Sequence, residues 1–270
     1  MSATSIFRDA LLRDRVALVT GGGSGIGAGI ARMLARHGAR VALLGRTMAK
    51  LEAGAAEIAA AGGEALPLAA DVREYLAVEA AMRATVDKLG GLDILVNSAA
   101  GNFLAPAAAL SANGFRAVID IDLCGTFNAS RAAYSHLAAR RGCIVNISAT
   151  QAFVPTPLQA HAGAAKAGIE KLTRDLALEW ASSGVRVNSV VPGPIEETEG
   201  MARLAPSGSK EKMMKYVPLG RWGRIDEVAE VVLFLCTPAA AFMTGASILL
   251  DGGTALMGAG RFFEMMTGGA

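Results

Sequence analysis

The chain is poor in residues on which several protein classes depend. Only three cysteines occur among its 270 residues, and none has C-x-x-C spacing. A disulfide framework and a metal site are therefore not expected, and a reducing compartment is favoured. No apolar run reaches the roughly 18 residues that a membrane-spanning helix requires, so no membrane span is predicted.

The chain also has little excess of one charge sign and no recognisable targeting signal. The formal net charge is +2 and no basic block occurs, which argues against a nucleic-acid partner. Residues 1–15 are polar and mixed in charge, unlike a secretory signal. The last residues match no retention or peroxisomal tripeptide. These observations predict a cytoplasmic protein.

Apolar segments, by contrast, are plentiful, with 52% hydrophobic and 19% charged residues. Short β-forming runs alternate with helical patterns, and this rhythm predicts parallel βαβ units. The expected fold is α/β: a three-layer, doubly wound parallel sheet (Rossmann fold) in a single domain over 1–270, with its ligand crevice at the carboxyl ends of the strands. The strands are expected at 16–19, 40–46, 64–69, 92–97, 142–147, 185–191 and 246–250, and the later helices at 111–140, 161–182 and 225–236. A polar, methionine-rich stretch at 196–217 is predicted to be a substrate lid.

A glycine-rich turn follows the first predicted strand. Glycine lets the backbone turn sharply and approach a ligand closely, and the next helix directs its N–H groups and positive dipole end at that ligand. Between a buried strand and an amphipathic helix, this pattern favours a dinucleotide pyrophosphate over an ordinary βα turn. The candidate cofactor-binding residues of the turn are Gly21, Gly23, Ser24, Gly25, Ile26 and Gly27.

The end of the second strand indicates which dinucleotide binds. A carboxylate there would bind the ribose 2′-hydroxyl of NAD, but the chain has Gly45-Arg46. The guanidinium of Arg46 suits a 2′-phosphate, which predicts NADPH; the alternative is a surface arginine. Asp71 and Val72, at the end of the third strand, are expected on the adenine side, or simply as a helix cap.

Several further motifs give the chain a resemblance to the short-chain dehydrogenase/reductase family along nearly its whole length. They are Thr20 to Gly27, Asp71-Val72, Asn97 to Gly101, Lys166, Arg186 to Ile195 and Asp251 to Gly253. The resemblance implies that the cofactor also contacts Asn97, Ala99, Lys166, Pro192, Gly193 and Ile195.

The chain departs from that family at the usual Asn-Ser-Tyr-Lys tetrad. Lys166 is present, but the tyrosine position is Ala162, the serine position is Ala149 and the asparagine position is Asp122. The three tyrosines of the chain all lie far from Lys166 in sequence. Enoyl-thioester reductases of this fold place a tyrosine seven residues before the lysine, where this chain has Gln159.

The departures match one subfamily. The segments 97–104, 120–128, 161–166 and 192–200 resemble the 2,4-dienoyl-CoA reductases, most of all the peroxisomal type. The resemblance implies NADPH-dependent reduction of a 2,4-dienoyl-CoA to a trans-3-enoyl-CoA in fatty acid β-oxidation. It also implies a homotetramer and an acyl-CoA thioester as substrate.

The missing tyrosine fits such chemistry. A ketone needs a proton on oxygen, which a tyrosine beside a lysine supplies; a dienoyl thioester needs an oxyanion stabiliser and a proton delivered to carbon. We therefore expect Asp122 and Lys166 to be the catalytic residues. Lys166 would hold the nicotinamide ribose, and Asp122 would orient or protonate a water. The alternative for Asp122 is a helix residue that only hydrogen-bonds to the backbone. The alternative for Lys166 is a solvated lysine on a helix.

Carrying over the contacts of the subfamily assigns candidates for the coenzyme A portion. Arg73 and Arg203 would bind its phosphates, and Phe103, Ser111 and Asn113 would line the acyl-pantetheine path. The alternatives are solvated arginines, a core phenylalanine and, for Ser111, a helix N-cap. His161, next to the lost tyrosine, titrates near neutral pH but has no role that the sequence defines.

Two other functions stay open at this point. One is a reductase of the same fold that uses Lys166 with Thr150 or Ser148 on a ketone or another enoyl thioester. The other is a non-catalytic NADP-binding sensor that lost its tetrad. Persistence of Lys166 and of the crevice motifs argues against the sensor.

Overall fold

The computed structural model describes residues 7, 10–198, 200–201 and 210–259. Strands and helices alternate along this part of the chain, as the sequence predicts. The strands are β1 (Val16–Thr20), β2 (Arg40–Gly45), β3 (Glu64–Ala69), β4 (Ile94–Asn97), β5 (Cys143–Ile147), β6 (Arg186–Pro192) and β7 (Ser247–Leu250). The helices are α1 (Gly25–Arg36), α2 (Met48–Ala60), α3 (Tyr75–Leu89), α4 (Ala112–Ile119), α5 (Gly125–Arg140), α6 (Ala160–Trp180), α8 (Lys210–Met214) and α9 (Ile225–Cys236).

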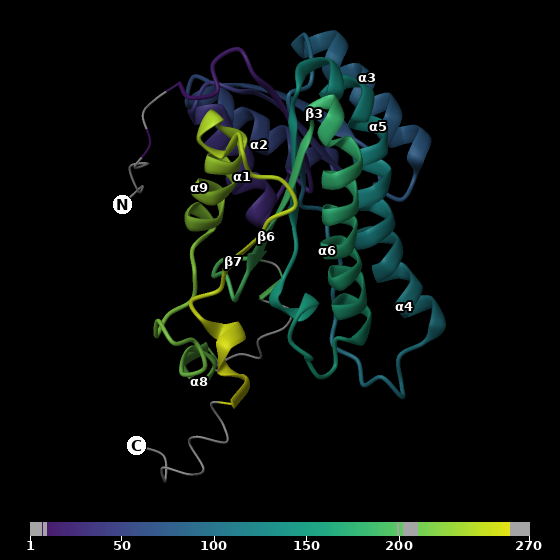
Figure 1. Cartoon of the computed structure of the whole chain (residues 1–270), viewed down its shortest axis with the longest axis vertical. Coiled ribbons are helices and arrows are strands. Elements are labelled where there is room, and N and C mark those ends of the chain that lie inside the picture. The colour runs from purple at the N-terminus through teal and green to yellow at the C-terminus, as the bar shows by residue number, and fades with distance from the viewer. Residues whose placement is uncertain (1–6, 8–9, 199, 202–209, 260–270) are drawn as a thin grey trace.

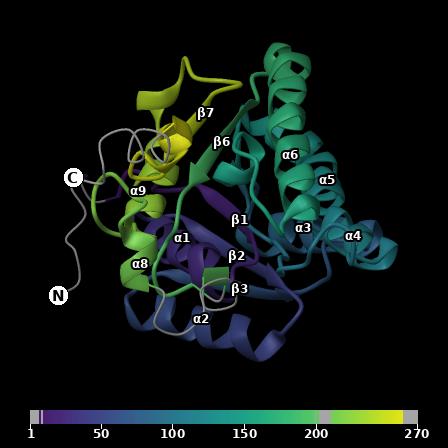
Figure 2. The ribbon, with the colours of Figure 1, turned by 90° about the horizontal axis from the view of Figure 1, so that it is seen from below.

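All seven strands form one parallel sheet in the order β3-β2-β1-β4-β5-β6-β7. Helices α1, α2 and α9 cover one face, and α3, α5 and α6 cover the other (Figures 1 and 2). This is the doubly wound three-layer fold expected from the sequence. The strand order reverses between β1 and β4, and that switch point is where a sheet of this kind binds its ligand.

The central strands are apolar throughout because both faces of the sheet are covered. Every residue of β1 is buried, and successive side chains enter opposite layers: Val16 and Leu18 pack towards α3 and α5, whereas Ala17 and Val19 pack towards α1 and α9. This period of two is the ordinary pleat of a strand. The rigid centre holds the carboxyl ends of β1 and β4 side by side.

The long helix expected at 111–140 has an interruption. Between α4 and α5 the backbone makes a five-residue π-helical turn, Asp120–Cys124. The hydroxyl of Thr126, in the first turn of α5, donates to the carbonyl oxygen of Asp122 in this widened turn at 2.6 Å. Turns of this kind often occur at functional sites, and here the turn contains Asp122.

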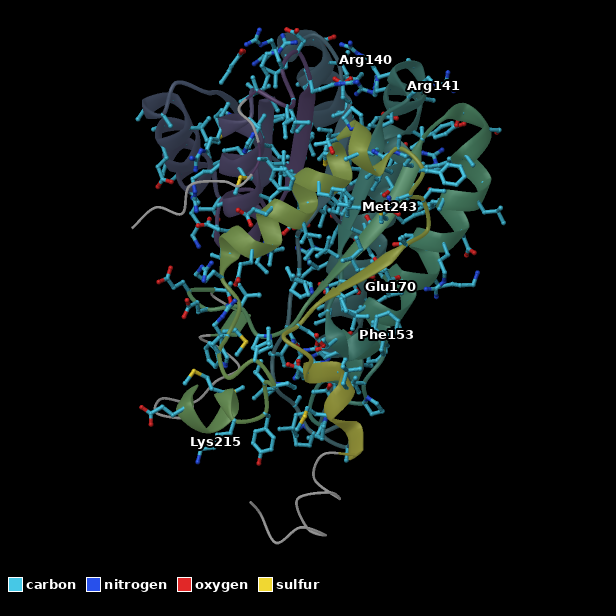
Figure 3. All side chains as sticks on the ribbon, turned by 60° about the vertical axis from the view of Figure 1, so that its left-hand side comes forward. Arg140, Arg141, Phe153, Glu170, Lys215 and Met243 are labelled. Atoms are coloured by element: carbon cyan, nitrogen blue, oxygen red, sulfur yellow. The ribbon has the colours of Figure 1, made fainter. Side chains whose placement is uncertain are left out.

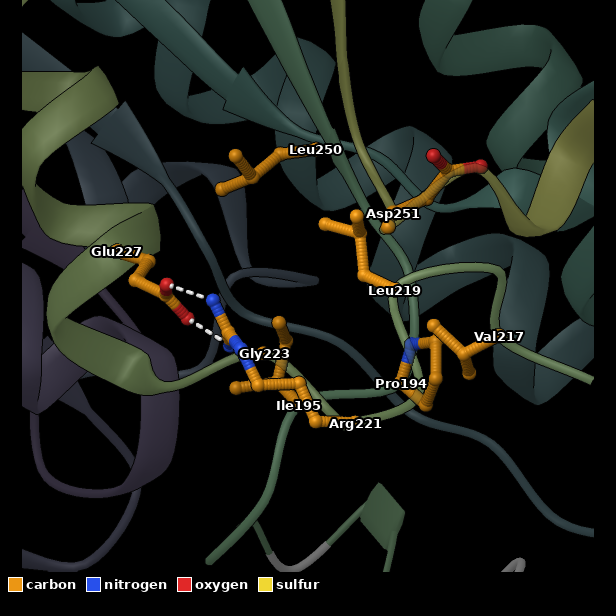
Figure 4. A pocket seen from close by; sticks show the side chains of 10 residues that line it. Pro194, Ile195, Val217, Leu219, Arg221, Gly223, Glu227, Leu250 and Asp251 are labelled. Carbon is orange, nitrogen blue, oxygen red and sulfur yellow. Dashed lines mark hydrogen bonds and ion pairs between the residues drawn. The ribbon is translucent and has the colours of Figure 1, made fainter. Parts of the chain in front are cut away.

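The segment predicted to be a lid, 196–217, lies partly outside the described residues. Its flanks are joined by a parallel bridge between Ile195 and Gly223. Leu219 N, just after the segment, donates to Gly252 O, just after β7, at 3.2 Å. A small pocket of about 90 Å³ lies at this junction. Figure 4 shows the Arg221 guanidinium facing the carboxylate of Glu227 in its lining. That the segment moves as a lid stays a prediction.

The two ends of the sheet differ in what they present. Phe153 and Lys215 lie at the crevice end, while Arg140 and Arg141, at the end of α5, lie at the opposite end (Figure 3). Among the described residues, no helix is long and apolar enough to cross a membrane.

Candidate active site

The glycine turn joins β1 to α1 with the close approaches that its sequence predicts. Gly21 has φ +68°, and a Cβ on Gly27 would lie 2.3 Å from the Gly21 carbonyl oxygen. The first turn of α1 contains no acidic residue, and the Ser24 side chain makes no capping bond. The helix N-terminus therefore offers N–H groups and a positive dipole end to an anion, as a pyrophosphate site requires.

The adenine side of the crevice contains two arginines with different surroundings. Arg73 forms a two-point ion pair with Asp71, at 3.0 and 2.6 Å, and hydrogen bonding from its guanidinium lowers the pKa of that carboxyl. Arg46 has no hydrogen bond or ion pair with the described residues, and its charge also reaches Asp71. Arg46 is thus available for a phosphate, whereas Arg73 already has a carboxylate partner.

A cavity of about 580 Å³ opens at the carboxyl ends of β1, β4, β5 and β6. The turn residues Ser24 to Gly27, both proposed catalytic residues and the segment Pro192 to Ile195 line it. Ala149 and Ala162 also line it, so the two emptied tetrad positions leave space and not a polar group. The cavity is large enough for a nicotinamide and part of a second ligand.

Asp122 and Lys166 meet in the wall of this cavity. Lys166 Nζ lies 3.2 Å from Asp122 Oδ2 and donates to the Ile147 carbonyl at 3.1 Å. Asp122 Oδ1 accepts the Gly101 N–H at 2.7 Å. Both side chains are buried, 1% and 8% exposed. An ammonium has three donors, so one N–H of Lys166 is left for a ligand.

Other predicted cofactor residues support the crevice from within. Thr20 Oγ1 accepts the N–H groups of Ser98 and Ala99, which ties β1 to the segment after β4. The Asn97 amide donates to Asn146 Oδ1 at 2.9 Å and is buried. Val72, on the adenine side, packs in the core below α3 and α5. Asn97 and Val72 are therefore placed to shape the crevice.

The predicted substrate residues differ in setting. Phe103 is 40% exposed and packs edge-on against His161, with ring centroids 4.4 Å apart. The Ser111 hydroxyl accepts the Gly114 N–H, so Ser111 is the helix N-cap expected from the sequence as its alternative role. Asn113 is exposed on α4. His161 is fully buried, is not part of the cavity wall and has no hydrogen-bond partner among the described residues. Arg203 lies outside the described residues.

Sequence reasoning missed two groups in the cavity wall. Tyr216 lines the cavity from the lid segment, although it is 50 residues after Lys166 in the chain. Asn102, Gln151 and Gln159 form a cluster of amide side chains on the same wall. A resemblance scored along the chain could not find either group, because each depends on loops that meet only in the fold.

The doubly wound sheet, the glycine turn and the buried lysine at the switch point define a nicotinamide-dependent oxidoreductase. A family model described as enoyl-(acyl carrier protein) reductase matches residues 21–255. The chain belongs to the short-chain dehydrogenase/reductase family.

Named relatives narrow the comparison. The chain is 46% identical over 251 residues to the Pongo abelii peroxisomal 2,4-dienoyl-CoA reductase, named as (3E)-enoyl-CoA-producing; this covers 92% of the chain and 86% of the relative. It is 40% identical over 246 residues to a Bacillus subtilis protein named "probable 2,4-dienoyl-CoA reductase [(2E)-enoyl-CoA-producing]", covering 90% and 97%.

Solved structures agree in fold. A Pseudomonas aeruginosa citronellol catabolism dehydrogenase superposes with a TM-score of 0.83 at 39% identity, covering 94% of this chain and all of that one. A Sinorhizobium meliloti dehydrogenase/reductase superposes with a TM-score of 0.86 at 38% identity, covering 91% and 97%.

Proposed function

We propose that the protein reduces 2,4-dienoyl-CoA to trans-3-enoyl-CoA with NADPH, a step in the β-oxidation of unsaturated fatty acids. The observation that carries the proposal is the buried Asp122–Lys166 pair in a cavity where the tyrosine and serine positions are Ala162 and Ala149. The names of the curated relatives support it.

The reaction has two chemical requirements at the substrate. NADPH, when bound, supplies a hydride to the δ-carbon of the dienoyl thioester. The electron pair displaced along the conjugated chain reaches the thioester oxygen as a dienolate, and a proton must then arrive at the α-carbon. A phenol aimed at a carbonyl oxygen is not needed for that proton.

The buried pair meets these requirements. Lys166 is held by Asp122 and by the Ile147 carbonyl, so its remaining N–H is directed rather than mobile, and we assign it to the nicotinamide ribose. Asp122 keeps its carboxylate in place through the Gly101 N–H. We assign to it the orientation of the water that protonates the α-carbon.

Arg46 supports NADPH over NADH. Its guanidinium, just after β2, makes no hydrogen bond or ion pair within the described part of the chain, and the sequence has no carboxylate at this position. The acyl-CoA phosphates are assigned to Arg73 and Arg203, and the pantetheine path to Phe103, Ser111 and Asn113. A phosphate at Arg73 would compete with Asp71 for its guanidinium.

The direct test is a substrate panel. Purified protein is given NADPH with 2,4-hexadienoyl-CoA, 2,4-decadienoyl-CoA, a crotonyl thioester and a simple ketone, and the double-bond position in the product is determined. Turnover of the dienoyl thioesters to a 3-enoyl product is expected. Reduction of the ketone alone would support a carbonyl reductase using Ser148 or Thr150, and NADPH binding without any turnover would support a sensor.

Tyr216 gives this test an internal control. Because it lines the cavity, it is the one tyrosine that the described structure offers as a substitute proton donor. Tyr216→Phe is expected to keep near-normal dienoyl-CoA turnover, since the proposed proton route does not pass through it. A homotetramer and a cytoplasmic location stay predictions.

A further inference from the structure

Three residues at the start of α6 line the cavity in one row. Gln159 is the N-cap of the helix, Ala162 follows three residues later and Lys166 four residues after that. Residues at this spacing share one helix face. At a rise of about 1.5 Å per residue, Gln159 lies roughly 10 Å along the helix axis from Lys166.

The carboxamide of Gln159 has a fixed orientation. Its Oε1 accepts from Asn102 Nδ2 at 2.6 Å and from Gln151 Nε2 at 3.2 Å. With Asn102 and Gln151 both donating, Oε1 is the acceptor end of the side chain, and turning Gln159 alone would bring donors against donors.

The opposite end of the carboxamide is left without a protein partner. Gln159 Nε2 donates to no acceptor in the described part of the chain, although the residue is only 8% exposed and lines the cavity. Nε2 is not one of the fully buried atoms without a partner, so it stays accessible to a ligand. Its two N–H groups are therefore available as donors in the cavity that Gln159 lines.

The position of these donors along α6 fits the length of a conjugated thioester. In a ketone, the oxygen is bonded to the carbon that receives hydride, so a donor four residues before the lysine reaches it; here that residue is Ala162. In a dienoyl thioester, the oxygen is separated from the δ-carbon by the whole conjugated chain. This moves it by about 5 Å, close to the pitch of one helical turn, and Gln159 lies one turn before Ala162.

We infer that Gln159 binds the thioester oxygen and stabilises the negative charge that develops on it, with Asn102 and Gln151 as positioning residues that hold its carboxamide. The inference rests on the proposed function and adds the oxyanion-binding group that the Asp122–Lys166 pair lacks. Loss of one such donor typically lowers kcat by about 100-fold or more.

Gln159→Glu is the sharpest test, because it is isosteric. A glutamate still offers an oxygen to Asn102 and Gln151, so the amide cluster and the fold are retained, but the donors in the cavity become an acceptor. We expect kcat for 2,4-hexadienoyl-CoA to fall at least about 100-fold, with the Kd of NADPH unchanged. Ala160→Glu, at the neighbouring exposed position, adds the same charge outside the cavity and should retain activity.

A spectroscopic readout separates oxyanion binding from a structural role. With a ¹³C-labelled thioester carbonyl, difference infrared spectra of the complex with NADP⁺ should show the carbonyl band at lower frequency in the wild type than in Gln159→Leu. Wild-type rates and an unchanged band in both Gln159 variants would overturn the inference alone. A wild-type protein that does not reduce any dienoyl-CoA would overturn the proposed function and, with it, this inference.

Discussion

Asp122 is the residue on which the proposed proton delivery depends. Asp122→Asn retains the shape and an oxygen for the Gly101 N–H but cannot pair with Lys166 as an anion. We expect kcat for 2,4-hexadienoyl-CoA to fall about 100-fold or more, the usual contribution of a positioned acid or base. Stopped-flow measurement of NADPH oxidation would check this.

The neighbouring Asp120 supplies a matched control. It lies in the same π-helical turn, is not part of the cavity wall and interacts electrostatically with Arg73. Asp120→Asn should therefore keep its turnover. Equal rates in Asp122→Asn and the wild type would remove Asp122 from the mechanism.

Arg46 decides the cofactor in our proposal. Arg46→Ala should raise the Kd of NADPH by about 10- to 100-fold, since a charge-assisted hydrogen bond to phosphate contributes about 1.5–3 kcal/mol. The Kd of NADH should hardly change, because NADH has no 2′-phosphate. Fluorescence titration with both nucleotides checks the prediction, and a parallel loss of both affinities would contradict it.

At the scale of elements, the start of α9 is stabilised by one carboxylate. Glu227 accepts two hydrogen bonds from the Arg221 guanidinium, at 2.9 and 2.6 Å, and one from the backbone N–H of Arg224 at 2.7 Å. These bonds, those from Arg221 above all, lower the pKa of Glu227 from 4.5 to about 2. Both side chains of the pair also line the small pocket drawn in Figure 4.

This lowered pKa predicts a defined acid sensitivity. The stabilisation is complete above pH 4.5, and it is lost as the pH falls from 4.5 towards 2 and the folded-state carboxylate is protonated. Glu227→Gln should lower the free energy of unfolding at pH 7 by on the order of 2 kcal/mol, after allowance for solvent screening. Urea unfolding across this pH range should show the difference from the wild type shrinking.

Glu179 offers the control for that experiment. It is exposed on α6 and makes no ion pair with the described residues. Glu179→Gln removes the same charge and should leave the unfolding free energy within about 0.5 kcal/mol of the wild type, as is usual for surface changes. A loss of the same size in both variants would mean that net charge, and not the Arg221 pair, is responsible.

At the scale of the whole molecule, two exposed aromatic side chains are candidate contacts for the predicted tetramer. Phe115 on α4 and Phe127 on α5 are 39% and 44% exposed, and apolar surface of this kind often marks subunit contacts. We expect light scattering to give about four times the chain mass of 27.6 kDa. Phe127→Glu should yield smaller species, whereas Met48→Glu on α2 should not; a monomeric wild type would refute the predicted tetramer.

Features that depend on the local sequence were easier to predict than features that depend on distant segments. The bounds of β3 and the doubly wound order follow from apolar periodicity and chain alternation, and the structure confirms them. The π-helical turn was not predicted, because a single widened turn shifts the helical pattern by only about one residue.

Features assembled from distant loops were also beyond the sequence. The cavity contact of Tyr216 and the amide bonds to Gln159 depend on loops that meet only in the fold. The ion pair of Arg73 with Asp71, by contrast, spans two residues and was within reach of the sequence as a local contact.

The strand order has a consequence for how such a protein could change. Because β1 and β4 are neighbours at the centre, residues 16–73 form one half of the sheet and supply everything assigned to the adenine and its ribose. Asp122, Gln159 and Lys166 all come from the other half. Apart from Arg73, which is assigned to the coenzyme A phosphates, the residues proposed for cofactor preference and those proposed for the reaction are therefore encoded by separate, contiguous lengths of the gene. A single recombination event near residue 90 could exchange one and leave the other inherited intact.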